Sequence, residues 1–227
     1  MQGPVQYGAV EIAEVVTALE AERARFLREV CWADIFSVSY YHVTRQEIEA
    51  IGRGQRRYPQ ERTVQLVRFY TLYAEARAAW DKDRSCPAPW KRYFGLAASM
   101  GSRARVRGSL FGDPAEKATR LMEYGTHAHI ACDLPRVLAD SFTRYSPAEL
   151  QADFNAMDPL FARGGRLTFI DLDRALRRSG PLRATHRAIF EPGEWLLRRF
   201  GGGASKVKRW RHAAWKEAAL QKPPRVG

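Results

Sequence analysis

Several residue patterns that mark well-known protein classes are missing from this 227-residue sequence. Cysteine is scarce: only Cys31, Cys86 and Cys132 occur, widely spaced and without a C-x-x-C pair. This usage argues against a disulfide framework or a zinc knuckle and favours reduced, cytoplasmic thiols. No window of about 18 apolar residues occurs, and no basic segment with a long apolar core opens the chain. We therefore expect a soluble, unprocessed, cytoplasmic protein with no membrane partner.

Motifs for phosphate, nucleotide and metal chemistry are also absent. The sequence contains no G-x-x-x-x-G-K-[ST], G-x-G-x-x-G, G-x-S-x-G or H-E-x-x-H motif. It also lacks the D-D-x-x-D run of ordinary metal-dependent prenyl-diphosphate cyclases. The glycine run at 201–203 is too unspecific to predict a phosphate site. We therefore predict no cofactor and no dedicated metal site.

Positive charge exceeds negative charge, with 37 Lys and Arg against 25 Asp and Glu, giving a formal net charge of +12. Such an excess favours acidic partners, including nucleic acid and anionic small molecules. Much of the excess is arginine, in the Ala- and Arg-rich style of chains from GC-rich genomes. The sequence leaves open whether this charge is functional or compositional.

Helical periodicity dominates what is present. Residues 9–30 and 61–82 place apolar side chains at helical spacing, with charges on the other side. Strand-like composition is confined to 34–43 and 166–171, which we interpret as helix or extended connectors because no hairpin turn joins them. The prediction is an all-α, single-domain orthogonal bundle of about seven to nine helices over 1–227. It comprises an N-terminal helix within 1–33, a core over 34–220 and a basic tail at 221–227.

Capping signals and turn residues predict where helices begin and end. Three segments have the form of a capping box: Thr44 to Glu47, Ser146 to Glu149, and 113–116 with aspartate as the cap. Ser205 is expected to cap the last helix. Loops are expected at 54–59, 83–88, 102–113, 163–165 and 200–204.

The segment E-Y-G-T-H-A-H-I-A-C-D-L-P-R-V-L at 123–138 concentrates polar chemistry in an apolar helix. On an α-helix His127 and His129 point to nearly opposite sides, so they cannot clamp one metal ion. Thr126, His129 and Asp133 share one face, and His129 and Asp133 can meet. The pair can be purely structural, an acid–base unit in which Asp133 orients His129, or half of a metal site. Pro135 is expected to bend the helix beside it.

The residues T-H-A-H-I-A-C-D-L-P at 126–135 resemble the segment G-x-N-A-H-I-x-x-D-L-P of an uncharacterised bacterial family of helical proteins, a domain of unknown function. Similar pieces occur in the same order: F-S-V-S-Y-Y-H-V-T at 36–44, Y-T-L-Y-A-E-A-R-A-A-W at 70–80, P-W-K-R-Y-F at 89–94 and R-H-A-A-W-K-E-A-A-L at 211–220. The resemblance covers about 34–220. It carries across His129, Asp133, Leu134, Pro135, Arg211 and Trp215, and it implies that His129, Asp133 and Arg211 belong to one motif set. His127 replaces an asparagine of the pattern.

The C-terminal segment A-S-K-V-K-R-W-R-H-A-A-W-K-E-A-A-L places Arg211 and Trp215 on the apolar side of a helix. An inward-facing arginine requires a carboxylate. We expect Arg211 to reach Asp133 and to dock this last helix against the 123–138 helix.

Three functional hypotheses remain after these exclusions. The first is a cofactor-independent acid–base enzyme of specialised metabolism, of cyclase, isomerase or lyase type, with a hydrophobic or aromatic small-molecule substrate. Its expected catalytic residues are His129, Asp133, Tyr41 and Tyr70, and its expected substrate-binding residues are Thr126, Tyr73, Trp90, Arg211 and Trp215. The alternative is a non-catalytic module that binds nucleic acid or another acidic partner through Arg103, Arg105, Arg107 and the C-terminal helix. A third, metal-dependent hypothesis uses His129 and Asp133 as ligands.

Overall fold

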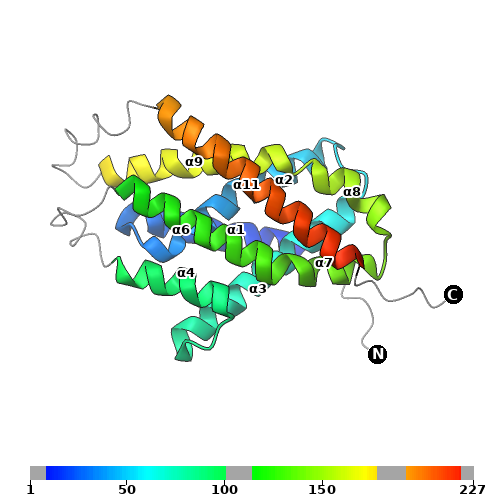
Figure 1. The fold of residues 1–227 in the computed structure, drawn as a ribbon, viewed down its shortest axis with the longest axis horizontal. Coiled ribbons are helices and arrows are strands. Elements are labelled where there is room, and N and C mark those ends of the chain that lie inside the picture. Colours follow the sequence, from blue (N-terminus) through cyan, green and yellow to red (C-terminus); the bar gives the residue numbers. More distant parts are fainter. Residues whose placement is uncertain (1–8, 101–113, 178–192, 221–227) are drawn as a thin grey trace.

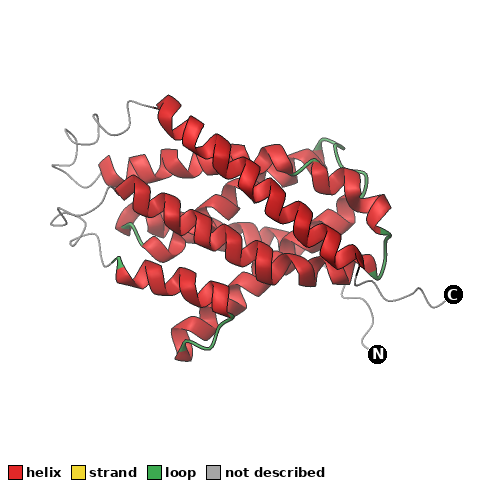
Figure 2. Ribbon diagram, in the orientation of Figure 1, coloured by secondary structure: helices red, strands yellow, loops and turns green. Residues whose placement is uncertain are grey.

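The computed structural model describes residues 9–100, 114–177 and 193–220, with side chains described for 11–100, 117–175 and 205–220. Across these ranges the regular structure is helical and contains no strand, which confirms the all-α prediction (Figure 2). The helices are α1 (Ala9–Glu29), α2 (Ile35–Gly52), α3 (Pro59–Asp83), α4 (Ala88–Ser99), α6 (Pro114–Ala128), α7 (Leu134–Phe142), α8 (Pro147–Asn155), α9 (Asp158–Arg177) and α11 (Gly193–Leu220). A 3-10 turn at Trp32–Asp34 precedes α2.

Helix α2 lies at the centre of the bundle and contacts α1, α3, α6 and α9. Helix α11 lies across α6, α7 and α9, and α6 continues into α7 (Figure 1). The strand-like segments 34–43 and 166–171 are helical because their β-branched and aromatic side chains fill this central packing, which overrides local propensity. Within the described ranges, no helix combines the length and hydropathy needed to cross a bilayer.

The apolar interior forms two clusters. The larger one contains the fully buried rings of Trp90, Tyr73 and Tyr93 and joins α1, α2, α3, α4, α6 and α9. The smaller one joins α7, α8 and α11 around Phe154 and Trp215. Phe69 of α3 packs against both clusters, so it marks the boundary between them.

Two glycines allow helices to approach α2 closely. A Cβ at Gly125 of α6 would lie 2.8 Å from Cβ of Phe36, and one at Gly164 of α9 would lie 2.6 Å from Cγ2 of Val43. Real Cβ atoms do not approach so closely, so a larger residue would push the helices apart. The loop expected at 163–165 is therefore wrong, because these glycines are in helix α9 and serve helix packing.

The capping predictions have mixed outcomes. The capping box of Ser146 and Glu149 is confirmed: the Ser146 hydroxyl accepts from the Glu149 N–H, and the Glu149 carboxylate accepts from the Ser146 N–H. The box at Thr44 is wrong, because Thr44 lies inside α2. Helix α11 begins at Gly193, so neither the loop at 200–204 nor a cap at Ser205 is present. The expected aspartate cap at 113, the loop at 102–113 and the tail at 221–227 lie outside the described residues.

Candidate active site

The helix that carries the 123–138 segment changes geometry at the predicted pair. Between α6 and α7, residues His129–Asp133 form a π-helical turn, and the N–H of Leu134 donates to the carbonyl of His129, five residues earlier. Pro135 follows immediately and has no N–H to donate, so regular α-helical bonding cannot continue through this point. Single π-turns of this kind are frequent at functional sites.

His129 and Asp133 do meet. Nδ1 of His129 lies 2.8 Å from Oδ2 of Asp133, and Nε1 of Trp90 donates to Oδ1 of the same carboxylate at 3.3 Å. Both residues of the pair are buried. A carboxylate oxygen can only accept a hydrogen bond, so Oδ2 of Asp133 favours the tautomer of neutral His129 that carries its proton on Nδ1. Nε2 then remains as the ring nitrogen that can accept a proton.

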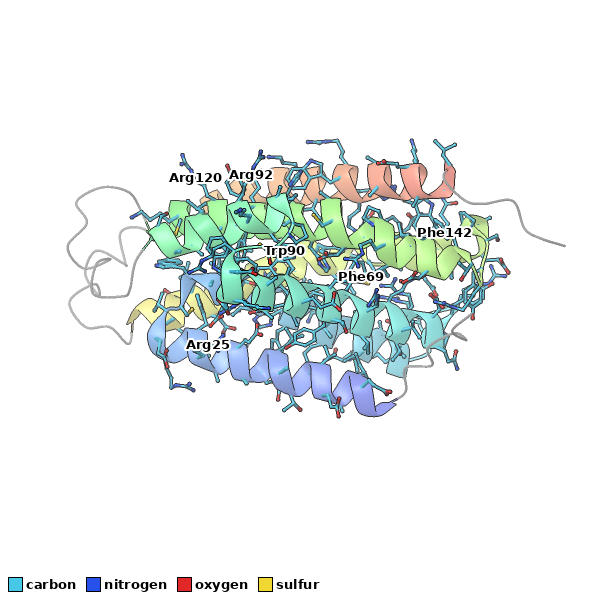
Figure 3. All side chains as sticks on the ribbon, turned by 90° about the horizontal axis from the view of Figure 1, so that it is seen from below. Arg25, Phe69, Trp90, Arg92, Arg120 and Phe142 are labelled. Atoms are coloured by element: carbon cyan, nitrogen blue, oxygen red, sulfur yellow. The ribbon has the colours of Figure 1, made fainter. Side chains whose placement is uncertain are left out.

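Aromatic rings surround the imidazole of His129. Its centroid lies 4.4 Å from that of Phe69, 5.3 Å from Phe36, 5.4 Å from Tyr40 and 6.4 Å from Trp90. Figure 3 labels both Phe69 and Trp90; Trp90 is fully buried, and Phe69 is partly buried against both apolar clusters. These contacts fix the ring plane, and they separate most of the ring from water.

A cavity opens at His129, on the boundary between the two apolar clusters. Its volume is about 60 Å³, and one water molecule occupies about 10–15 Å³ of such space, so the cavity can hold a small organic group. Helices α2, α3, α6, α7, α8, α9 and α11 all contribute to its walls. The lining residues are Phe36, Ser39, Tyr40, Val43, Arg62, Gln65, Leu66, Phe69, Thr126, His129, Ile130, Leu134, Leu138, Phe154, Met157, Phe161 and Arg211.

Three of the predicted site residues line this cavity: Thr126, His129 and Arg211. Asp133 and Trp90 do not line the cavity: Asp133 contacts Nδ1 of His129, and Trp90 donates a hydrogen bond to Asp133. Tyr73 is fully buried in the larger cluster, and Trp215 packs on Phe154 at a centroid distance of 4.3 Å in the smaller one.

The two predicted tyrosine acids do not reach the cavity. Tyr41 packs under the guanidinium of Arg23, and Tyr70 is half-buried near Tyr73. Burial raises the pKa of Tyr70 to about 12. Tyr40, the neighbour of Tyr41, lines the cavity instead: its hydroxyl donates to the carbonyl of Leu66 at 2.9 Å, and burial raises the pKa of its phenol so that it stays protonated.

The expected ion pair between Arg211 and Asp133 is wrong. Arg211 donates through Nη1 to Asp158 and through Nη2 to the carbonyl of Phe154 at 2.8 Å. Asp133 is already satisfied by His129 and Trp90. Arg211 therefore docks α11 against α8 and the start of α9, and its guanidinium forms part of the cavity wall.

Arg62 and Gln65, which the sequence did not single out, form one wall of the cavity together with Phe69. Arg62 donates to the buried carboxylate of Glu47 through Nε at 2.9 Å and also bonds Gln65 through Nη1. These three residues recur at i, i+3 and i+7 on α3, a helical spacing that marks one face. The spacing could have located them, but a charged residue on a helix face is more often solvated.

The remaining polar candidates lie elsewhere. His127 is exposed and its ring contacts Trp210 at 4.9 Å, away from the cavity. Arg103, Arg105 and Arg107 lie outside the described residues. Among the residues with described side chains, no group of three or more His, Cys, Asp or Glu is arranged to hold a metal ion.

The comparisons with known proteins add a family but no activity. Residues 12–112 match DUF5995, a family of unknown function. The predicted resemblance to an uncharacterised family is thereby confirmed, although the matched range ends before the segment around His129. The matched range includes α2 and α3, which supply part of the cavity wall through residues such as Tyr40 and Arg62. No curated protein and no solved structure matches the chain.

Proposed function

We propose that the protein is an acid–base enzyme that binds a small apolar or aromatic molecule in the cavity and exchanges a proton with it through His129. The observation that carries the proposal is the 2.8 Å contact between Nδ1 of His129 and Oδ2 of Asp133 at the wall of an otherwise largely apolar cavity. Asp133 is a positioning residue, because it touches only the far side of the imidazole.

The chemistry follows from the two ring nitrogens. Asp133 keeps the proton on Nδ1, so the lone pair on Nε2 can accept a proton from a bound molecule, and Asp133 stabilises the imidazolium that results. The protonated ring can then return a proton at another position of the same molecule. The phenol of Tyr40 stays protonated, and its oxygen can accept a hydrogen bond from the substrate. Such a proton transfer matches the isomerase, lyase and cyclase classes.

The experiment compares two histidines of the same segment. Purified wild-type protein, His129→Asn and His127→Asn are each incubated with a cellular metabolite extract, and substrate loss is followed by mass spectrometry. Asparagine at 129 can place its amide nitrogen where Nδ1 lies and so still donate to Asp133, while Nε2 is lost. We expect metabolite turnover by wild type and His127→Asn and none by His129→Asn. Equal turnover by the two variants, or no turnover by wild type, contradicts the proposal.

A further inference from the structure

The charged side chains that face the cavity are all of one sign. Its ionisable lining residues are Arg62, Arg211, His129 and Tyr40, and no carboxylate lies among the lining residues that the structure describes. The carboxylates nearest to them, Glu47, Asp158 and Asp133, lie behind the groups that they bind.

Each of the two arginines shares its carboxylate with other basic side chains. Glu47 is bound by Arg62 and also by Arg56, whose Nη2 approaches to 2.5 Å. Asp158 is bound by Arg211, by Nζ of Lys208 at 3.3 Å and by Nε2 of His212 at 3.2 Å. The next buried carboxylate, Asp153, accepts the backbone N–H groups of residues 57 and 58. Positive charge on the cavity wall is therefore only partly compensated.

The two guanidinium groups also have hydrogen-bond capacity left. A guanidinium has five N–H donors. Arg62 uses Nε and Nη1, and Arg211 uses Nη1 and Nη2, for contacts with described residues. Nη2 of Arg62 and Nε of Arg211 make no such contact within the described part of the chain. Arginine binds carboxylates through pairs of such donors.

Burial makes this charge costly for the empty protein. Only 4% of Arg211 is exposed, and desolvation, opposed by Asp158 and assisted by the charge of Arg62, lowers the pKa of Arg211 to about 9. An anion placed between the two arginines would relieve both the desolvation and their mutual repulsion.

The rest of the cavity requires an apolar ligand body. Most of the other lining side chains are aromatic or aliphatic, and two of them, Phe36 and Phe69, also pack on His129. The apolar lining residues are Phe36, Val43, Leu66, Phe69, Ile130, Leu134, Leu138, Phe154, Met157 and Phe161. A highly charged molecule would leave most of its hydration unreplaced by these walls.

From these observations we propose that the cavity binds a monocarboxylate with an apolar or aromatic body, its carboxylate held by Arg62 and Arg211. The inference deepens the proposed function and rests on it, since it names the substrate class of the same site. Carboxylate binding itself does not require that His129 transfers a proton.

The test uses the methionine methyl groups as reporters. The chain has four methionines, of which Met157 lines the cavity, whereas Met100 and Met122 belong to the larger apolar cluster. Protein labelled with ¹³C at the methionine methyls is titrated with benzoate and with its neutral isostere benzamide. We expect benzoate to shift the Met157 signal saturably and to bind roughly ten- to hundredfold more tightly than benzamide, because only benzoate offers the arginines an ionised acceptor with two equivalent oxygens.

Matched variants locate the anion. Arg211→Gln should bring benzoate binding close to that of benzamide. Arg144→Gln should leave it unchanged, because Arg144 makes a comparable two-bond contact with a buried carboxylate, Glu61, away from the cavity. Should Arg211→Gln fail to fold, the benzoate and benzamide comparison on wild type decides the matter alone.

The outcomes separate this inference from the proposed function. Equal binding of benzoate and benzamide, or no shift of Met157 up to the solubility limit of benzoate, overturns the inference. Selective benzoate binding supports it even where His129-dependent turnover is absent. Turnover without carboxylate selectivity supports the proposed function and overturns the inference.

Discussion

The imidazole of His129 is held on one edge by a carboxylate and surrounded by rings. Asp133 fixes which nitrogen carries the proton, Trp90 fixes Asp133, and Phe36 and Phe69 hold the ring plane. None of these four side chains forms a hydrogen bond with Nε2. An acid–base group requires such restraint at one nitrogen, while the other nitrogen is left without a bond to these side chains.

Replacing Asp133 with Asn tests this restraint at a single residue. The amide keeps the shape but can donate a hydrogen to Nδ1, which favours the tautomer with the proton on Nε2. Turnover should fall by a factor on the order of 10²–10⁴, as expected when a base is held in the wrong tautomer. The turnover rates of wild type and Asp133→Asn on the same substrate are compared, and circular dichroism shows whether both proteins are folded. Full activity of the folded Asp133→Asn variant would show that Asp133 is structural.

The sequence located the right helix face for some residues and missed it for others. The i, i+4 spacing predicted the meeting of His129 and Asp133, because it depends only on local geometry. It did not separate Tyr40 from Tyr41, since the two neighbours differ only in which way α2 is rotated within the bundle. The partner of Arg211 was equally hidden, because Asp158 lies 53 residues away and meets it only through the packing of α11.

Among the helices, α2 both lines the cavity and forms the close contacts with α6 and α9. It supplies Phe36, Tyr40 and Val43 at helical spacing to the cavity wall. Two of these, Phe36 and Val43, are the residues that contact Gly125 and Gly164. Two residues that line the cavity therefore also form the close contacts of α2 with α6 and α9.

Substituting Gly164 with Ala tests that close approach. The new Cβ would meet Cγ2 of Val43, a β-branched side chain with little rotational freedom. We expect a loss of about 1–3 kcal/mol in the free energy of unfolding, in spite of the better helix propensity of alanine. Urea denaturation gives the value.

Gly52→Ala is the matched control. Gly52 ends α2, and no atom lies within 4 Å of a Cβ placed there. It should be neutral or stabilising by up to about 1 kcal/mol. Equal effects of the two substitutions would mean that Gly164 is not a packing position.

Helix periodicity and turn residues predicted most of the elements. Helices α1, α3 and α8 lie close to where the pattern placed them, and the Ser146 cap depends only on neighbouring residues, so the sequence predicts it directly. Gly164 was mistaken for a loop residue because glycine favours turns, whereas here it serves a contact between distant helices. The π-turn at His129–Asp133 was not predicted, because the pattern analysis assumes one constant helical period.

Across the whole molecule, several arginines form ion pairs with buried carboxylates. Arg25 and Arg77 bind the buried carboxylate of Asp34. Glu47, Glu61 and Asp171 are likewise buried, and each is bound by one or more arginines that link separate segments: Arg56 and Arg62, Arg144, and Arg23. These arginines therefore serve ion pairs inside the bundle, but the pairing leaves the net charge of +12 unchanged, because that value already subtracts the 25 acidic residues from the 37 basic ones.

Asp171 gives a pH test of this arrangement. Burial opposes its ionisation, but hydrogen bonds from His42 and Arg23 outweigh that cost and lower the pKa of Asp171 to about 2. Since the ordinary aspartate pKa is about 3.9, its stabilising contribution is complete above that value and is lost as the pH falls toward about 2.

We expect the difference in unfolding free energy between wild type and Asp171→Asn to shrink by about 2 kcal/mol over this interval. Denaturant unfolding of both proteins, followed by circular dichroism between about pH 5 and about pH 2.5, measures it. A difference that stays constant with pH would show that the Asp171 contacts contribute nothing through ionisation.

If Nε2 of His129 transfers the proton in the cavity, the two histidine variants must differ in activity. The measurement is the ratio of turnover rates of His127→Asn and His129→Asn on the same metabolite, with wild type as reference. The two substitutions are chemically identical and lie two residues apart, one at an exposed histidine beside Trp210 and one at the cavity wall. A ratio on the order of 10² or more is the predicted result. A ratio near one, with both variants folded, would contradict the claim.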